Sequence, residues 1–421
     1  MRPARRAWRT TMASAAAAVV ATSLSCCGPS GQTNAAGAIV ITHGGTYSGG
    51  WSSDDPATAA VTVRTAEPVV IEHATVRGKG TLIAVVAGHA DVTVRDTVGT
   101  GENPAVAGRS PGRFLTAESF DRVVVEHCEL DHTAGIYLLT NAGRGDGAVR
   151  VIANRATDID GRLSDGHGGW LTFNDRKSNR DGHVEHGYAV VQFLQLDKVR
   201  GEGMEVAWNE VVNEPGRSRV EDNISVYESG GTAGSPLLIH DNCVRGAYTV
   251  DPARRDSKDV EWSYDWSYSG GGLMLGDGSG RTADTAPAFV RATDNVVIAT
   301  ANYGIGISAG HDITFDHNRI VSAGVLPDGR AVAAQNVGAY VWDAGHGRER
   351  GTFFGNGGTD NVIGWAKGGG RNDSWRPDAA IWSGNRPLRG PVTPGDEAAA
   401  VTEWRARAAR AGVTVGPDRP R

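Results

Sequence analysis

Three carboxylates stand at the same point of a short pattern that recurs along the chain. Each copy alternates apolar and variable residues and then turns at glycine: DNISVYESGG (222–231), GGGLMLGDGSG (270–280) and GAYVWDAGHG (338–347). The acids before the turns are Glu228, Asp277 and Asp343. Two carboxylates held close together can cleave a glycosidic bond, one as acid and the other as base or nucleophile. Carboxylates can equally bind Ca²⁺ or stabilise turns ahead of glycine.

We therefore predict Glu228, Asp277 and Asp343 as catalytic residues, with a Ca²⁺ site at Glu228 and Asp277 as the alternative. A polysaccharide bound beside these acids would need polar and aromatic contacts. The outward residues that the repeated pattern places near the acids are Gln192, Gln195, Tyr227, Tyr340 and Trp342. The aromatic segment EWSYDWSYSGG adds Trp262, Asp265 and Trp266 to this predicted substrate-binding set. No cofactor besides Ca²⁺ is indicated.

A second repeat supplies the scaffold that would return the chain to these positions. An asparagine follows a short apolar run in six copies, at Asn154, Asn209, Asn242, Asn295, Asn318 and Asn361. Earlier copies place other residues at this position: Ala74, Asp96 and Cys128. Short intervals between copies fit one coil of a solenoid, and long intervals fit a coil with an insertion. The apolar runs alternate as strands do, so strands of successive coils would pair in parallel about 4.8 Å apart.

This arrangement resembles the right-handed parallel β-helix, the pectin-lyase-like superfamily with its stacked asparagines. The resemblance covers residues 38–385 and implies an all-β solenoid of about nine or ten coils. Two segments, GGGLMLGDG and GIGISAG, also faintly resemble motifs of polygalacturonases, but Gly304 stands where that family has a histidine. Many chemistries share the β-helix scaffold, so the resemblance predicts the fold without predicting the activity.

Alignment on the asparagines places the outward residues of the first strand of each coil in columns. One column contains Tyr137, Gln192, Ser225, Met274, Gly306 and Tyr340. The column at the strand ends contains Thr140, Gln195, Glu228, Asp277, Ala309 and Asp343. This register makes Glu228 and Asp277 neighbours on adjacent coils. Strict alternation would nevertheless point Glu228 inward, so either the strand ends before Glu228 or the alignment slips by one residue.

The amino terminus carries the features of an export signal. Residues 1–27 combine a basic start, an apolar run and small residues, the organisation of a secretory signal peptide. Arg5-Arg6 resembles a twin-arginine signal, and LSCC resembles a lipobox in which Cys27 or Cys26 would carry a lipid. The sequence thus predicts an exported protein that is either extracellular or anchored to the outer face of the cell membrane.

Four further segments are expected to lie outside the coils. Residues 28–37 form a predicted linker, and 386–421 form a second linker with a helix at 396–412 that would cap the open end of the solenoid. The insertions 158–188 and 247–271 interrupt the repeat. Because both leave the coil after the same position, we expect them to border one groove.

Charge and cysteine content limit the partners. The net charge of −6 gives no signature of a nucleic-acid-binding protein. The expected partner is a polysaccharide, the only expected membrane contact is the lipid anchor, and the expected state is a monomer. Cys128 and Cys243 would lie several coils apart, too far for a disulfide, so we predict two buried free thiols.

Three functions remain open from the sequence. The first, slightly preferred because the chain is acidic, is hydrolysis of glycosidic bonds. The second is a polysaccharide lyase acting on a uronate polymer, which needs a base and a positive charge or Ca²⁺. The third is a non-catalytic surface protein that binds a glycan or another envelope component.

Overall fold

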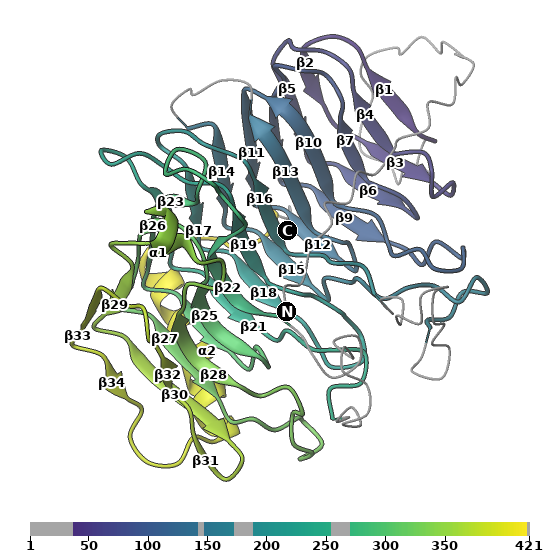
Figure 1. Ribbon diagram of the computed structural model, residues 1–421. Helices are drawn as coiled ribbons and strands as arrows, with labels where there is room; N and C mark the ends of the chain where they lie inside the picture. Colours follow the sequence, from purple (N-terminus) through teal and green to yellow (C-terminus); the bar gives the residue numbers. More distant parts are fainter. Residues whose placement is uncertain (1–36, 142–146, 172–187, 254–269, 419–421) are drawn as a thin grey trace, which may run out of the picture. The chain divides into compact units, whose positions relative to one another are not determined.

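Three long parallel sheets enclose one core, and each turn of the chain adds a strand to each sheet (Figure 1). The computed structural model describes residues 37–141, 147–171, 188–253 and 270–418. Every strand of the first coils pairs with the strand three further along, so that β1 pairs with β4 and β2 with β5. The chain is a right-handed parallel β-helix, the hand expected of parallel strand crossovers. The predicted all-β fold class is confirmed.

The strands fall into a first, a second and a third sheet in chain order. The first sheet consists of β1 (Ile39–Ile41), β4 (Val61–Val63), β7 (Ile83–Val85), β10 (Leu115–Phe120), β13 (Ile136–Asn141), β16 (Leu194–Asp197), β19 (Ile224–Tyr227), β22 (Gly271–Asp277), β25 (Tyr303–Ile307), β28 (Val337–Val341) and β32 (Ser374–Trp375). The second sheet consists of β2 (Gly45–Tyr47), β5 (Val69–Glu72), β8 (Asp91–Arg95), β11 (Arg122–Glu126), β14 (Val149–Ile152), β17 (Glu205–Ala207), β20 (Leu237–His240), β23 (Ala288–Thr293), β26 (His311–Asp316), β29 (Gly357–Thr359) and β33 (Ile381–Ser383).

The third sheet completes each coil. It consists of β3 (Gly50–Ser53), β6 (Thr75–Gly78), β9 (Val98–Gly101), β12 (Glu129–Asp131), β15 (Arg155–Thr157), β18 (Glu210–Val212), β21 (Cys243–Arg245), β24 (Val296–Ile298), β27 (Arg319–Ser322), β30 (Val362–Lys367) and β31 (Gly370–Arg371), with β34 (Arg386–Pro387) on β30. The two helices are α1 (Gly347–Arg350) and α2 (Pro394–Arg410). The first and second sheets have 11 strands each in the described chain, so the expected nine or ten coils were too few.

A ladder of buried asparagines marks the bend between the second and third sheets. The Nδ2 of Asn209 donates to the Oδ1 of Asn242, and that of Asn242 donates to the Oδ1 of Asn295, both at 2.9 Å. The ladder extends from Asn154 to Asn385. The residue before each rung has a left-handed backbone, as at Trp208 with φ 57° and Asp241 with φ 53°. The predicted asparagine column is therefore confirmed.

Four coils of the described chain carry a residue other than asparagine at the ladder position, and two rungs lie outside the predicted repeat. Gly49 precedes β3 in the first coil, and Asn385 precedes β34 in the last. In the third coil Val98 pairs with Glu129, so Thr97 rather than Asp96 occupies the position of Cys128. Asp96 instead has the left-handed conformation of the bend, with φ 46°. The predicted alignment was thus one residue early at this coil.

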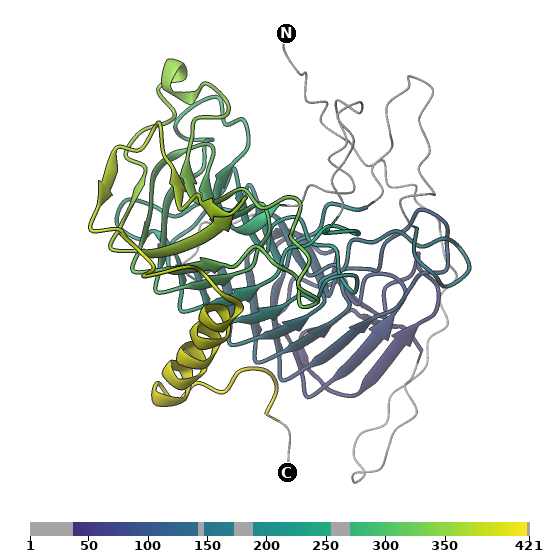
Figure 2. The same cartoon turned by 90° about the horizontal axis from the view of Figure 1, so that it is seen from below.

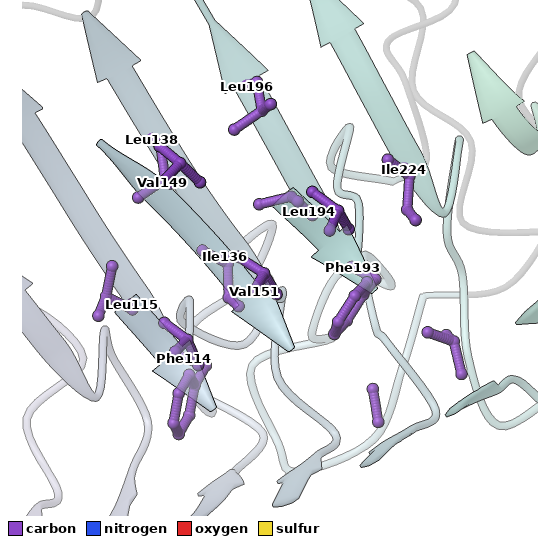
Figure 3. Packing of buried hydrophobic residues seen from close by; sticks show 14 of the residues in the cluster. Phe114, Leu115, Ile136, Leu138, Val149, Val151, Phe193, Leu194, Leu196 and Ile224 are labelled. Atoms are coloured by element: carbon purple, nitrogen blue, oxygen red, sulfur yellow. The ribbon is translucent and has the colours of Figure 1, made fainter. Parts of the chain in front are cut away.

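Inward side chains of the first sheet stack in rows along the axis of the β-helix. Leu115, Ile136, Leu194 and Ile224 form one such row, and Val149 and Val151 meet it from β14 in the second sheet (Figure 3). All are fully buried. Period-two alternation therefore leaves the other side chains of these strands on the outer face of the first sheet. Cys128 and Cys243 are both buried free thiols, as predicted.

Helix α2 packs along the side of the third sheet and does not close an end of the β-helix (Figure 2). Its Trp404 and Ala400 pack against Cys243, Val296 and Ile298, and the Trp404 Nε1 donates to the Asp241 carbonyl at 2.6 Å. The apolar face of the helix thus packs on outward apolar residues of β21 and β24. The predicted capping role of this helix was wrong.

The predicted insertions leave and re-enter the coil at the same corner. The first follows β15 and leads to β16, while the second follows β21 and leads to β22. Both therefore flank the starts of first-sheet strands. The export signal, Cys26, Cys27 and nearly all of the linker 28–37 lie outside the described residues. In the described chain no helix has the length and apolarity needed to cross a membrane.

Candidate active site

Polar side chains gather on the outer face of the first sheet at β13, β16, β19 and β22. Tyr137 lies opposite Gln195, and Gln195 lies opposite Ser225. The next outward column places Leu139, Asp197, Tyr227 and Asp277 opposite one another along these four strands. The predicted register was wrong for the β16 strand, because Gln195 and not Gln192 pairs with Tyr137. The predicted alignment had shifted Gln192 and Gln195 by three positions along this strand. It had also left out Asp197.

A β-bulge explains the remaining disagreement over register. Between β19 and β22 the pairing passes from Ser225–Met274 to Tyr227–Asp277, so β22 carries one extra residue. Asp277 therefore lies opposite Tyr227 and not opposite Glu228. Glu228 follows the end of β19 and has a left-handed backbone with φ 47°. Because β19 has already ended at Tyr227, the alternation of the strand does not apply to Glu228 and its carboxylate does not point into the core.

Five residues form what we call the acid corner: Asp197, Lys198, Tyr227, Glu228 and Asp277. Lys198 Nζ lies 2.7 Å from Asp197 Oδ1 and 3.8 Å from Glu228 Oε2. The same ammonium lies 5.2 Å from the centre of the Tyr227 ring. Two carboxylates thus flank the Lys198 ammonium, and Asp277 lies on the next coil opposite Tyr227. The sequence signal for this corner was Asp197-Lys198 directly after the apolar run of β16.

Each carboxylate of the acid corner has a distinct set of partners. Tyr137 donates its hydroxyl to Asp197 Oδ2 at 2.8 Å. Glu228 Oε1 accepts the backbone N–H of Ser279 at 3.1 Å. Asp277 Oδ1 accepts the N–H of Gly278 at 2.7 Å, which is the turn-forming bond expected of Asp before Gly. Within the described structure, Asp277 Oδ2 has no hydrogen bond and is available to a ligand.

The charges of the corner perturb its neighbours. Burial raises the pKa of Tyr227, and the nearby carboxylates of Glu228 and Asp277 raise it further. Partial burial acts to lower the pKa of Lys198, but the hydrogen bond to Asp197 and the charge of Glu228 outweigh this effect and raise it. Lys198 is therefore charged at neutral pH and is held as a counter-ion, and Tyr227 is a neutral hydroxyl.

A second titratable group, Asp222, lies two residues before β19, where it contacts Tyr303 next to Met274 and Tyr340. Its Oδ1 accepts the backbone N–H of Gly271 at 2.7 Å and also the hydroxyl of Tyr303. Burial raises the pKa of Asp222 to about 7, with further contributions from the charges of Glu221 and Asp277. The neutral form of this carboxyl is thus favoured far more than that of an ordinary aspartate. The sequence analysis missed it, because Asp-Asn before a strand has the composition of an ordinary turn.

The other predicted site residues occupy different surroundings. Asp343 follows β28, and its two oxygens accept the N–H groups of Gly347 at 2.6 Å and Arg348 at 2.8 Å, at the start of α1. Both oxygens thus hold a turn, and we do not retain Asp343 as a catalytic candidate. Gln192 donates to Glu221 Oε2 at 3.3 Å, and Gln195 donates to the Leu196 carbonyl at 3.2 Å.

Aromatic residues continue along the first sheet beyond the acid corner. The rings of Tyr303 and Tyr340 meet edge to face with centres 5.0 Å apart. Trp342 is 42% exposed. Trp262, Asp265 and Trp266 lie outside the described residues, so their predicted role stays a prediction. Among the described side chains, no group of three or more His, Cys, Asp or Glu is arranged to hold a metal ion.

Comparison with known proteins adds little beyond the fold. No protein-family model and no curated protein matches the chain. Among solved structures, the chain is similar to a mannuronic-acid-specific polysaccharide lyase of family 6 from the human gut microbiota. The identity is 11%, the similarity covers 90% of each chain, and the TM-score is 0.33. A likeness at this level carries no argument about the activity of the present chain.

Proposed function

We propose that this chain is an exported enzyme that hydrolyses glycosidic bonds of a polysaccharide lying across the outer face of the first sheet. The observation that carries the proposal is the presence of two unlike carboxyls on adjacent coils, Asp222 beside the start of β22 and Asp277 at its end, with the charge of Asp277 acting on Asp222. Asp222 is largely buried and has a pKa of about 7, whereas Asp277 belongs to the acid corner and has an oxygen free for a ligand. A glycoside hydrolase needs one carboxylic acid and one carboxylate.

The proposed roles follow from these environments. Asp222 donates its proton to the oxygen of the departing sugar, because burial and the charges of Glu221 and Asp277 stabilise its neutral form and outweigh the hydrogen bond from Tyr303. Asp277 acts as the ionised partner, either activating water or attacking the anomeric carbon. Lys198 keeps Asp197 and Glu228 in place by its contacts to both. Tyr137 and Tyr227 supply hydroxyls and ring faces along the same columns.

Hydrolysis fits the charges of the corner better than elimination does. A lyase must stabilise the anion that forms when a uronate loses a proton, which requires a cation near the uronate carboxylate. Lys198 is already paired with Asp197 and Glu228. Arg113, over the Tyr137 ring, donates to the Ala134 carbonyl at 2.7 Å. The acid corner contains three carboxylates and one lysine, so it would repel a polyanionic substrate, which favours a sugar without charge at the cleavage point.

The test is an activity screen on the mature protein with neutral and acidic polysaccharides. New reducing ends without an unsaturated product indicate hydrolysis, and an ultraviolet-absorbing unsaturated sugar indicates a lyase. Asp277→Asn and Asp222→Asn should each lower kcat by at least about 100-fold, the usual size of a lost acid or base. The control is Asp328→Asn, which alters an exposed loop aspartate bonded to Arg330 and should leave kcat unchanged.

Each outcome decides between the functions. Loss of activity in both site variants, with normal unfolding, supports the proposed pair. A fully active Asp277→Asn enzyme contradicts the assignment of the site. Unsaturated products from the wild type replace the hydrolase with the lyase. Binding of a polysaccharide without turnover by any member of the panel leaves the non-catalytic surface protein as the function.

A further inference from the structure

Two exposed tryptophans extend the outer face of the first sheet beyond the acid corner. Trp375 in β32 lies opposite Tyr340 in β28, and Tyr340 lies opposite Gly306 and, through it, Met274. Trp342 directly follows Val341, the last residue of β28. We call Trp342 and Trp375 the tryptophan pair. Trp375 thus continues the column of Ser225 and Met274, and Trp342 lies at the strand end as Asp277 does, on the last two coils of the sheet.

The two indoles form one exposed surface. Their ring centres are 5.1 Å apart, with the planes inclined by 44°. Trp342 is 42% exposed and Trp375 is 46% exposed. Tryptophan is normally a well-buried side chain, and in this chain Trp365 and Trp404 are almost entirely buried. Two neighbouring tryptophans that both face solvent are therefore available for a ligand with a flat apolar face.

Planar polar groups lie next to this aromatic surface. Asp378 accepts the backbone N–H of Asp343 at 2.9 Å and donates its own N–H to the Val341 carbonyl at 3.3 Å. Its other oxygen lies 2.9 Å from the Arg348 guanidinium, which is 54% exposed. A carboxylate and a guanidinium fixed beside two indoles can accept and donate hydrogen bonds to adjacent hydroxyls. The Arg348 guanidinium is paired with Asp378, so the surface has no excess positive charge for an acidic group.

We propose that the tryptophan pair binds an uncharged pyranose unit of the polysaccharide, some distance from the bond that is cleaved. This deepens the proposed function and rests on it for the position of the cleaved bond. A pyranose ring combines an apolar face, which suits the indoles, with a rim of hydroxyls, which suits Arg348 and Asp378. Trp342 stands two coils beyond Asp277, about 10 Å by strand spacing. The substrate would then run along the sheet towards its last coils and be cleaved inside the chain.

The first test measures binding and does not depend on catalysis. Neutral gluco-, manno- and xylo-hexaoses and an acidic hexauronate are titrated into the full chain, with tryptophan fluorescence and calorimetry as readouts. We expect a neutral hexaose to bind and the double variant Trp342→Ala/Trp375→Ala to raise its Kd by about tenfold or more, as for a lost aromatic contact. Trp375→Phe should retain most of the affinity. Phe354→Ala, at another exposed aromatic, is the matched control and should not change Kd.

The second test separates this inference from the proposed function. In an active enzyme, the double variant should raise KM for the long polymer and leave kcat unchanged, because the pair binds ground state and transition state alike. If no substrate is turned over but a neutral hexaose binds through the pair, the proposed function fails and the inference survives. An unchanged Kd and KM in the double variant, a preference for the hexauronate, or no hexaose binding at all would overturn the inference. So would a wild-type dimer that becomes a monomer in the double variant, because the pair would then serve self-association.

Discussion

Replacing Asn242 by alanine tests the physical role of the asparagine ladder. Asn242 is fully buried, and its Nδ2 donates to the Val206 carbonyl and to Asn295 Oδ1, both at 2.9 Å. Its Oδ1 accepts the backbone N–H of Asn209 at 3.0 Å and the Asn209 Nδ2 at 2.9 Å. Alanine leaves the Val206 carbonyl and the Asn209 N–H without these partners in a dry interior. At about 1–3 kcal/mol for each unsatisfied group, the free energy of unfolding should fall by about 4 kcal/mol.

The assay is urea unfolding followed by circular dichroism, supported by hydrogen exchange of the Asn209 amide, because a stack of coils can open locally. Asn385→Ala is the matched comparison. Asn385 makes the same bonds to Asn361 but is only half-buried at the last rung, so water can replace it and the loss should be about 1 kcal/mol. Equal losses at both rungs, or a loss below about 1 kcal/mol at Asn242, would refute the argument from buried unsatisfied groups.

Two further predictions concern the titration and the metal content of the site. The pKa of Asp222 rises from about 3.9 in the unfolded chain to about 7 in the native chain, so the native state binds more protons between these values. Stability should therefore fall by about 4 kcal/mol as the pH rises from about 4 to 7, and Asp222→Asn should flatten this dependence in unfolding measured across that range. A chelator should leave the unfolding midpoint unchanged, because Glu228 and Asp277 already accept backbone N–H groups. A midpoint that rises with added Ca²⁺ would instead establish the alternative site at these two carboxylates.

The repeat was enough to predict the fold, and particular residues show why. An asparagine before most third-sheet strands satisfies a bend that recurs at every coil, so Asn209, Asn242 and Asn295 identify the period without any knowledge of contacts. The prediction failed where a coil uses another residue, as with Gly49 and Thr97. The backbone hydrogen-bonding groups of the bend can be satisfied by residues other than asparagine. A count of the recurring asparagines therefore gives too few coils.

The location of helix α2 could not be predicted in the same way. The predicted helix 396–412 begins two residues too late, because Thr393 and Asp396 form a capping box and the helix starts at Pro394. Its apolar face contains Trp404. Nothing local states which surface that face will cover. The outward apolar residues Val296 and Ile298 of β24 become one surface with Cys243 of β21 only when two coils are stacked.

The sequence by itself determined that carboxylates recur at one end of the first-sheet strands, because period-two alternation and turn chemistry are local properties. It indicated Glu228 and Asp277 in this way. The tertiary structure alone decided which acids meet. A single extra residue in β22 moved Asp277 opposite Tyr227, and stacking brought Lys198 against Glu228. The protonation of Asp222 was also decided there, because a pKa depends on burial and on charges from other coils, and neither is encoded within a short stretch of chain.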